Sequence, residues 1–429
     1  MDEARERTVE ETPVLDVRTR PDNAEWTGNF SFSLNGQQAA GIIMTEEGEF
    51  GVATNEGQWD VAFENLWKLR YTPNGRLTAL ASSLGVWTLI VDQEPWPEEY
   101  EYIWEPMFAA AQSRIAAAIK QDGQYAMAVD GQNWPRFFLN ATDFTMDRSG
   151  SHTGCVVQTK PLDAGDIQGF QAGAFTVAVD GRPWEHNFLN VWSPALASFG
   201  GKAAATVRTT LNAYTIAVDG QPWPTEFAMA WEPFFISNGS VLAPVMLNKR
   251  WGLAQDGDML WDPSYLQLWH VQSSSAGQNI WAIGSPRYGH FTVICNNRPW
   301  NHTYPVLTDL RMSPDGQRAA AVGQSPAQNP DNDQGLARQK WQVIVDDKPW
   351  SGWYDQVFPP VFSPDSRHVA VRVKHNGYFA FLLDGALLPR TFDAAWDPVF
   401  TGNGDAVLIR ARSNDQLVRV IAPFGQFES

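Results

Sequence analysis

One phrase recurs along almost the whole chain, and it constrains the fold more than any other feature. It reads apolar-x-apolar-x-Val-Asp-Gly-x-Pro-Trp, with the clearest copies ending at Trp134, Trp184 and Trp223. Weaker copies cover 92–96, 256–261, 296–300 and 346–350, and outlying ones cover 55–59 and 384–388. The nine copies follow one another at intervals of 37 to 39 residues, apart from two intervals of 50. Such periodicity indicates a repeat protein, whose units must stack on one another to bury their apolar faces.

The residues around the phrase predict four short strands per repeat. Tight-turn sequences such as Pro314-Asp315-Gly316 and Asn74-Gly75 separate strand-like runs such as 368–373 and 291–294, because Pro presets one φ and Gly accepts a positive one. Four-stranded antiparallel sheets that stack face to face form an all-β propeller. We predict up to ten blades over residues 13–429, with strands near Asp16 and over 416–421 closing the ring in one shared blade. Two smaller rings also fit the pattern, and residues 1–12 are predicted to be a flexible tail.

Aspartate and tryptophan hold fixed places in the phrase, and we interpret both as structural. A second aromatic follows the first by eight residues in seven of the nine copies, where a 13% aromatic content would give about one by chance. The fixed spacing indicates that the tryptophans at both aromatic positions of the repeat fill the wedge between blades. One aspartate per turn fits Asx-type hydrogen bonding better than a ring of metal ligands. The structural repeat residues are Asp92, Trp96, Asp130, Trp134, Asp180, Trp184, Asp219, Trp223, Trp261, Trp300, Asp346 and Trp350.

The two 50-residue intervals contain insertions at the same place, between the second and third predicted strands. Both repeats also carry threonine, Thr142 and Thr308, in place of the second aromatic. Equivalent loops emerge on one face of a propeller, so this face is the predicted partner-contact surface. The candidate contact residues are Leu162, Asp163, Asp166 and Ile167 in the first insertion, and Asn329, Asp331 and Asp333 in the second.

Composition excludes several classes of function. The 48 acidic and 31 basic residues give a formal charge of −17, which opposes binding to nucleic acid or to an anionic membrane. No run of apolar residues is long enough to span a membrane, and the start of the sequence has no signal-peptide core, which predicts a cytoplasmic protein. Cys155 and Cys295 lie 140 residues apart and are predicted to be buried free thiols, with no iron–sulfur, zinc or haem motif.

The sequence offers no catalytic, cofactor-binding or metal-binding residues that we would assign. A G-x-S-x-G motif is absent, and the histidines at 152, 186, 270, 290, 302, 368 and 375 are interpreted as scattered surface or capping residues, although His152 with Asp147 nearby is a conceivable base. Residues 331–335 resemble a calcium loop only faintly. The rival hypotheses are a quinone-cofactor propeller enzyme or another ligand-binding propeller with a site in the axial channel, and a carbohydrate-binding propeller.

The Pro-Asp-Gly turns and the Val-Asp-Gly-x-Pro-Trp phrase resemble WD-repeat-like propellers of sulfate-reducing bacteria, in particular the tryptophan-rich D subunits of Tmc-type transmembrane electron-transfer complexes. The resemblance covers about residues 25–425. It implies an accessory scaffold subunit without a cofactor, attached to the cytoplasmic side of the inner membrane through its partners. Those partners would be an iron–sulfur subunit of heterodisulfide-reductase type and a cytochrome b membrane subunit, with a periplasmic multihaem cytochrome c across the membrane.

Overall fold

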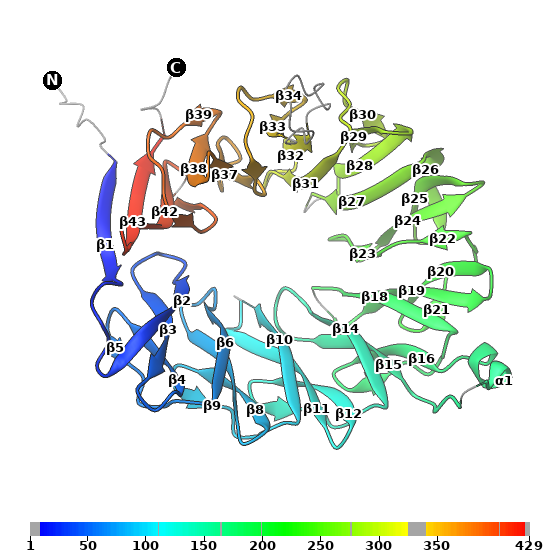
Figure 1. Cartoon of the computed structure of the whole chain (residues 1–429). Helices are drawn as coiled ribbons and strands as arrows, with labels where there is room; N and C mark the ends of the chain where they lie inside the picture. The colour runs from blue at the N-terminus through cyan, green and yellow to red at the C-terminus, as the bar shows by residue number, and fades with distance from the viewer. Residues whose placement is uncertain are drawn as a thin grey trace, which may run out of the picture. The chain divides into compact units, whose positions relative to one another are not determined.

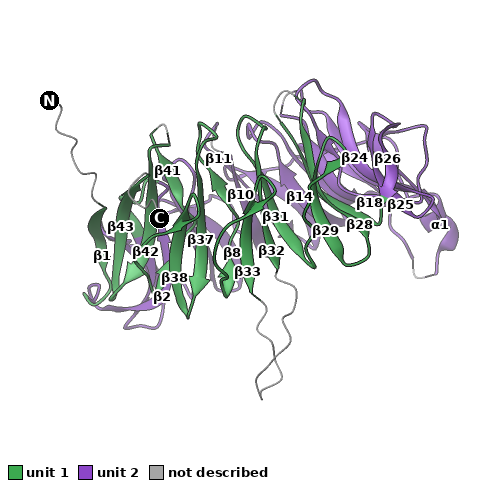
Figure 2. Ribbon diagram, turned by 90° about the horizontal axis from the view of Figure 1, so that it is seen from above, with its two compact units in different colours: residues 1–19, 35–39, 265–429 green, residues 20–34, 40–264 purple. Residues whose placement is uncertain are grey.

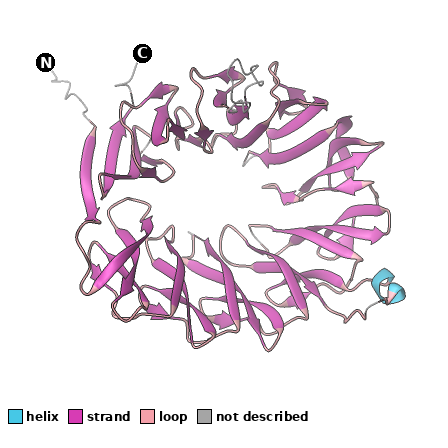
Figure 3. Cartoon of the chain, in the orientation of Figure 1, coloured by secondary structure: helices cyan, strands magenta, loops and turns pink. Residues whose placement is uncertain are grey.

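The structure is a computed structural model that describes residues 9–109, 111–163, 165–198, 200–274, 277–324, 340–402 and 404–424. It confirms the predicted fold class: the chain forms ten antiparallel sheets, the blades of a propeller, and within the described ranges α1 (Ile167–Gln171) is the one helix (Figure 3). The chain divides into two compact units, coloured in Figure 2. Unit 1 comprises residues 1–19, 35–39 and 265–429, and unit 2 comprises residues 20–34 and 40–264.

Unit 2 contains six blades (Figure 1); in five of them the strands pair in chain order, and in the sixth the first two short strands both pair with the third. The first three are β2 (Ala24–Phe32), β3 (Ala39–Thr45), β4 (Phe50–Thr54) and β5 (Gly57–Gln58); β6 (Asn65–Tyr71), β7 (Leu77–Ser83), β8 (Val86–Val91) and β9 (Glu94–Pro95); and β10 (Tyr102–Ala109), β11 (Arg114–Gln121), β12 (Gln124–Val129) and β13 (Gln132–Asn133). The next three are β14 (Asn140–Met146), β15 (Thr153–Gln158), β16 (Phe175–Val179) and β17 (Arg182–Pro183); β18 (Asn190–Leu196), β19 (Ala203–Thr210), β20 (Ala213–Val218) and β21 (Gln221–Pro222); and β22 (Met229–Ala230), β23 (Phe234–Phe235), β24 (Val241–Leu247), β25 (Arg250–Gln255) and β26 (Asp258–Tyr265).

Unit 1 contains four blades, the last of which joins both ends of the chain. The first three are β27 (Gln267–Ser273), β28 (Ile280–Arg287), β29 (His290–Cys295) and β30 (Arg298–Pro299); β31 (Leu307–Met312), β32 (Ala319–Gln324), β33 (Trp341–Val345) and β34 (Lys348–Pro349); and β35 (Gln356–Val357), β36 (Val361–Phe362), β37 (Val369–His375), β38 (Tyr378–Leu383) and β39 (Ala386–Leu387). The fourth is β40 (Ala394–Ala395), β41 (Val399–Thr401), β42 (Ala406–Ser413), β43 (Gln416–Pro423) and β1 (Glu10–Asp16).

Strands from the two termini complete this shared blade, as the sequence predicts. Strand β1 pairs antiparallel with β43, with Glu10 opposite Ile421 and Asp16 opposite Gln416. Strand β1 begins at Glu10, inside the segment 1–12 that the sequence predicts to be a flexible tail. Pairing with β43 satisfies backbone groups that a free tail would leave to water.

The first strand of a blade bends directly after the position of the second repeat aromatic. The residue there has a φ of 49–53°, and the register with the second strand shifts at the same point, at Lys68, Glu105, Asp143, Ser193, His270 and Asp309. In three other blades the first strand is split at this place into two short pieces, both of which pair with the second strand.

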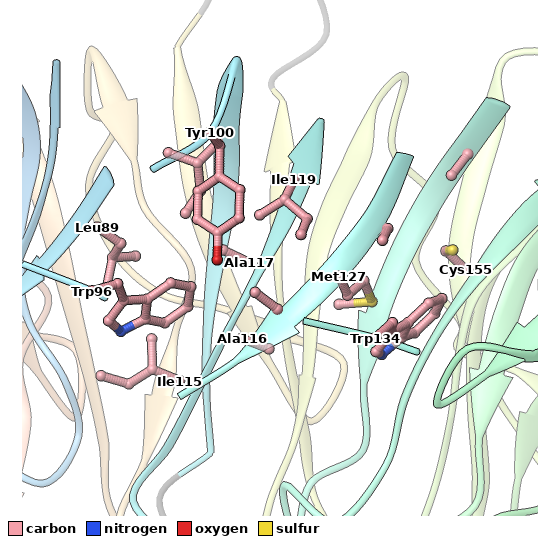
Figure 4. Packing of buried hydrophobic residues seen from close by; sticks show 14 of the residues in the cluster. Leu89, Trp96, Tyr100, Ile115, Ala116, Ala117, Ile119, Met127, Trp134 and Cys155 are labelled. Atoms are coloured by element: carbon pink, nitrogen blue, oxygen red, sulfur yellow. The ribbon is translucent and has the colours of Figure 1, made fainter. Parts of the chain in front are cut away.

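The core lies between neighbouring blades, where large and small side chains alternate. Figure 4 shows Trp96 and Trp134 packed with Ile115, Met127 and other buried residues in the cluster that spans blades of unit 2. Second strands carry runs of fully buried alanines, at 116–118, 203–205 and 319–321. Small residues on these strands leave room for the tryptophans and isoleucines, which is how interiors reach crystal-like packing.

Candidate functional site

The repeat aspartate joins two strands of its own blade. Its Oδ1 accepts a hydrogen bond from an N–H at the start of the second strand, as from Ile115 to Asp130 and from Ala203 to Asp219, both over 2.9 Å. Other blades repeat the bond with the acceptors Asp92, Asp180, Asp256, Asn296, Asp346 and Asp384. The eight acceptor residues have φ of 48–51°. The carboxylate thus bonds to the neighbouring strand, whereas the sequence suggested a bond within its own turn.

The second carboxylate oxygen faces the basic residue that precedes the second strand. Arg76 Nε lies 2.9 Å from Asp92 Oδ2, and Arg318 Nε lies 2.8 Å from Asp346 Oδ2. His152 Nδ1 lies 2.7 Å from Asp180, and His368 Nδ1 lies 2.6 Å from Asp384. These two histidines share one repeat position, so the interpretation of all seven as scattered is wrong. Such half-exposed pairs stabilise by about 0–1 kcal/mol each and serve the turn.

The suggested partnership of His152 with Asp147 is limited to one backbone contact. The N–H of Asp147 donates to the carbonyl of His152 over 3.0 Å. The carboxylate of Asp147 accepts hydrogen bonds from the Ser149 hydroxyl and the Ser151 N–H, both over 2.9 Å. The side chain therefore closes a turn and does not orient the imidazole.

The glycine of the phrase contacts the tryptophan of the preceding blade. A Cβ on Gly220 would lie 3.1 Å from Trp184 Cβ, and a Cβ on Gly181 would lie 3.3 Å from Trp134 Cβ. Gly131, Gly257 and Gly385 approach Trp96, Trp223 and Trp350 in the same way. Where the glycine is replaced by aspartate at Asp347, its carboxylate accepts hydrogen bonds from the N–H groups of Asn301 and His302, next to Trp300. The turn of one blade is thereby fastened to the phrase of the blade before it.

The two tryptophan positions differ in burial. The first is buried at Trp96, Trp134, Trp223 and Trp261 and half-buried at Trp184, Trp300 and Trp350. At the second position, Trp192 and Trp231 are 37% and 48% exposed. The prediction that both positions fill the wedge is therefore wrong at Trp192 and Trp231, whereas Trp67 and Trp269 are half-buried and pack against core clusters.

The second-position aromatics contact an aromatic near the start of the third strand of the same blade, edge-to-face at Trp67 and Trp87 and stacked at Trp231 and Trp251. Ring centroids lie 4.5 Å apart for Trp67 and Trp87, and 5.4 Å apart for Trp231 and Trp251. Eight bridges link this third-strand aromatic to another aromatic 13 residues later, as in Tyr125 to Phe138. Sequence reasoning missed this second repeat of aromatics, although its constant spacing is visible in the sequence.

The first insertion lies between β15 and β16, as predicted, and carries α1. Asp166 caps the helix, its Oδ1 accepting a hydrogen bond from the Gly169 N–H over 2.8 Å. The helix has no buried residue, and Ile167 is 68% exposed. Asp163 and Asp166 are exposed and Leu162 is half-buried. Figure 1 shows α1 standing out from the strands of its blade. At the base of the insertion, the N–H of Thr159 donates to the carbonyl of Ala174 over 2.9 Å.

The second insertion joins β32 to β33. Its candidate contact residues, Asn329, Asp331 and Asp333, lie outside the described residues.

Two shallow hollows lie at equivalent places in the repeat, one in each unit. The hollow in unit 2, of about 440 Å³, is lined by His152, Asp180, Arg182, Trp184 and Asp219, with three further residues. The hollow in unit 1, of about 500 Å³, is lined by Cys295, Asn296, Arg298, Pro299, Trp300, Asn301 and Asp347. Each places a half-buried tryptophan beside an exposed guanidinium, an arrangement that can hold a small planar or acidic group.

Both thiols are free, and Cys155 is fully buried whereas Cys295 is half-buried. Burial raises the pKa of each thiol, and Arg298 opposes this shift at Cys295. In the part of the chain that the structure describes, no three His, Cys, Asp or Glu residues are grouped to hold a metal ion. The described helix is too short to cross a membrane.

No protein-family model matches the sequence, and no curated protein matches it significantly. The chain is similar to solved structures at low identity. One, described as a eukaryotic initiation factor, has 12% identity and a TM-score of 0.46, covering 83% of this chain and 96% of the other. The Dos1 propeller has 8% identity and a TM-score of 0.34, covering 98% and 97%. The β-propeller domain of the Trilobed protease from Pyrococcus furiosus has 7% identity and a TM-score of 0.31, covering 65% and 94%. None of these similarities bears on function.

Proposed function

We propose that the chain is a non-catalytic docking subunit, a rigid propeller that binds protein partners through its inserted loop. The observation that carries the proposal is the insertion between β15 and β16, which forms a capped helix that buries no side chain and exposes Ile167. Ordering backbone opposes folding by about 1–2 kcal/mol per residue. An ordered segment that adds nothing to the core is accounted for by contact with another molecule.

The partner class comes from the resemblance to the D subunits of Tmc-type complexes. On this proposal the chain binds the cytoplasmic side of a membrane electron-transfer complex, through an iron–sulfur subunit and a cytochrome b membrane subunit. It holds no cofactor itself and acts as a scaffold. The charge of −17 is consistent with attachment through protein partners, since an anionic membrane surface would repel it.

The test is affinity purification of the chain from the native membrane fraction, followed by absorption spectra and proteomics. Haem and iron–sulfur subunits in fixed stoichiometry are the expected result. In a second protein, residues 161–172 are replaced by a short Gly/Ser linker, which keeps Thr159 and Ala174 at the base. This variant should lose the partners with an unchanged melting temperature. Partners retained by the variant would contradict the role of the insertion, and a chain purified alone would contradict the redox partnership.

A ligand-binding propeller is the second candidate, and the hollow beside Trp184 is the observation that favours it. Arg182 and the Trp184 ring lie together at its wall. If this candidate holds, native mass spectrometry of the purified chain should find a small molecule, and Arg182→Ala should release it. A quinone cofactor would add absorption above the tryptophan band. Protein free of any bound molecule that also fails to capture one from cell extract would eliminate this candidate.

A further inference from the structure

One hairpin of unit 2 carries a leucine where equivalent turns carry asparagine or aspartate. Leu84 and Gly85 join β7 to β8 with φ of 52° and 80°. The other turns between second and third strands whose two residues are both left-handed begin with Asp122, Asn248, Asn376 and Asn414, at φ of 50–52°. Asn and Asp adopt this conformation readily, whereas a leucine is strained in it. Leu84 is also 90% exposed, so packing does not explain it.

Two further apolar side chains lie on the same connection in nearby blades. Leu211, in the turn between β19 and β20, is 50% exposed, and Ile167, between β15 and β16, is 68% exposed. Equivalent connections of stacked blades emerge on the same side, so these residues share one face of unit 2. We call the connections β7–β8, β11–β12, β15–β16 and β19–β20, which belong to four consecutive blades, the turn face. Exposed apolar side chains thus stand at three of these four connections, where they offer separate anchor points to one extended partner.

The apolar tips are held in place by polar contacts around them. The N–H of Leu84 donates to Glu64 Oε2 over 3.0 Å. The carbonyl of Leu211 accepts a hydrogen bond from Arg208 Nε over 3.1 Å, and this guanidinium lies 5.6 Å from the centre of the Tyr214 ring. A tip that is already ordered loses little entropy on binding, which favours its use as an anchor.

The surroundings of the turn face are acidic. Glu64 and Glu101 each accept a hydrogen bond from a turn between second and third strands, and Glu226 accepts one from the Thr209 hydroxyl near the end of β19. Exposed Asp122, Asp163 and Asp166 lie on these connections themselves. The nearby cations are fewer than these six carboxylates: Lys120 lies 3.4 Å from Glu101, Arg208 donates to the carbonyl of Leu211, and Lys160 is exposed on the β15–β16 connection. The remaining charge around the apolar tips is negative, so it attracts a basic rim and repels an anionic one.

We propose that the turn face of unit 2 docks a protein surface whose apolar side chains are bordered by lysines and arginines. Leu84, Ile167 and Leu211 supply the apolar contacts, and the surrounding carboxylates select the basic rim. A second copy of this chain and an anionic lipid surface both carry the wrong charge for this face. The inference rests on the proposed function and adds to it the chemistry of the partner.

The test uses the purified full chain and two amphipathic helical peptides of equal length, one of leucine and lysine and one of leucine and glutamate. Fluorescence anisotropy should show binding of the lysine peptide and none of the glutamate peptide. The triple variant Leu84→Asn, Ile167→Asn, Leu211→Asn keeps every charge and should weaken binding about tenfold or more. Leu260→Asn is the matched control, because Leu260 is 44% exposed on β26 and outside the turn face. This control should bind as the original chain does.

The single change Leu84→Asn provides a second readout. Asparagine relieves the strained φ, so this variant should melt at a higher temperature while it binds more weakly. Three results would overturn the proposal: equal binding of the triple variant, equal binding of the glutamate peptide, or binding to phosphatidylglycerol vesicles that the triple variant loses. The peptide titration uses the isolated chain, so its result tests the chemistry of the turn face alone. Co-purification of redox subunits tests the proposed function separately.

Discussion

The contact between the glycine of the repeated phrase and the tryptophan of the preceding blade can be tested by comparing glycine-to-alanine variants that differ in the space around the added Cβ. Gly220 has a φ of +80°, and a Cβ there would lie 3.1 Å from Trp184 Cβ and 3.3 Å from Trp184 Cγ. Gly220→Ala therefore introduces both a left-handed alanine and a steric overlap. The first effect opposes folding by about 1–2 kcal/mol, and overpacking a closed contact adds about 1–3 kcal/mol. We expect a total loss of about 2–5 kcal/mol in the free energy of unfolding.

Two other glycines separate these effects. Gly289, at φ +72° in an open hairpin, has nothing within 4 Å of an added Cβ, so Gly289→Ala reports the backbone effect alone. Gly257 has a φ of +96°, and its added Cβ would be in ordinary contact with Trp223 at 3.5 Å. Urea unfolding followed by tryptophan fluorescence should show similar losses of about 1–2 kcal/mol for these two variants. If Gly220→Ala loses no more stability than Gly289→Ala, the close contact with Trp184 does not fasten the blades and the reasoning is refuted.

Three other predictions follow from the repeat and its neighbours. Asp130→Ala removes the acceptor for the Ile115 N–H and should lower the free energy of unfolding by about 1–3 kcal/mol. Asp130→Asn should keep most of this stability, because Asn296 accepts the equivalent bond in its own blade. Equal losses for the two variants in urea titrations would contradict the role of the repeat aspartate as an acceptor for the second strand. Although burial opposes ionisation, hydrogen bonds from Asn301 and His302 hold the pKa of Asp347 below its ordinary value. Its stabilisation is therefore present above the unfolded-state pKa of about 4 and lost as the pH falls through the lower folded value. Asp347→Asn should flatten this acid limb when urea midpoints are measured against pH, and an unchanged limb would contradict the assignment. Iodoacetamide should label Cys295 slowly and Cys155 only after unfolding. Burial raises the pKa of both thiols, but only Cys155 is fully buried. Mass spectrometry that finds Cys155 modified in the folded chain would contradict this prediction.

The sequence predicts the architecture well because its signals are local. Asp-Gly and Pro-Asp-Gly turns, short apolar runs and a 38-residue period determine four strands per repeat without reference to the rest of the chain. The shared terminal blade follows from the phase of the repeat at Asp16 and over 416–421. Histidines 152 and 368 were misinterpreted although their shared position is visible in the sequence, because each follows the first-position tryptophan of its repeat, Trp134 or Trp350, by 18 residues.

The candidate contact surface was predictable only in part. The position of the first insertion follows from the 50-residue interval, and the structure places it between β15 and β16. Leu84 and Leu211 were missed, since a single exposed leucine in a turn looks unremarkable in one sequence. Comparison of the turns within the chain, in which Asn or Asp begins four others, would have revealed Leu84.

By itself the sequence determined the fold class, the strand pattern and the turn residues, because these depend on φ preferences and on alternation over a few residues. Only the tertiary structure decided which tryptophans are buried, because the burial of Trp96 and the exposure of Trp231 depend on what the neighbouring blade places against each ring. It also decided that the repeat aspartate bonds to the adjacent strand and that the phrase glycine contacts the preceding tryptophan. These contacts join residues that are distant in sequence, and repeat spacing carries no information on the distance between side chains in adjacent strands and blades.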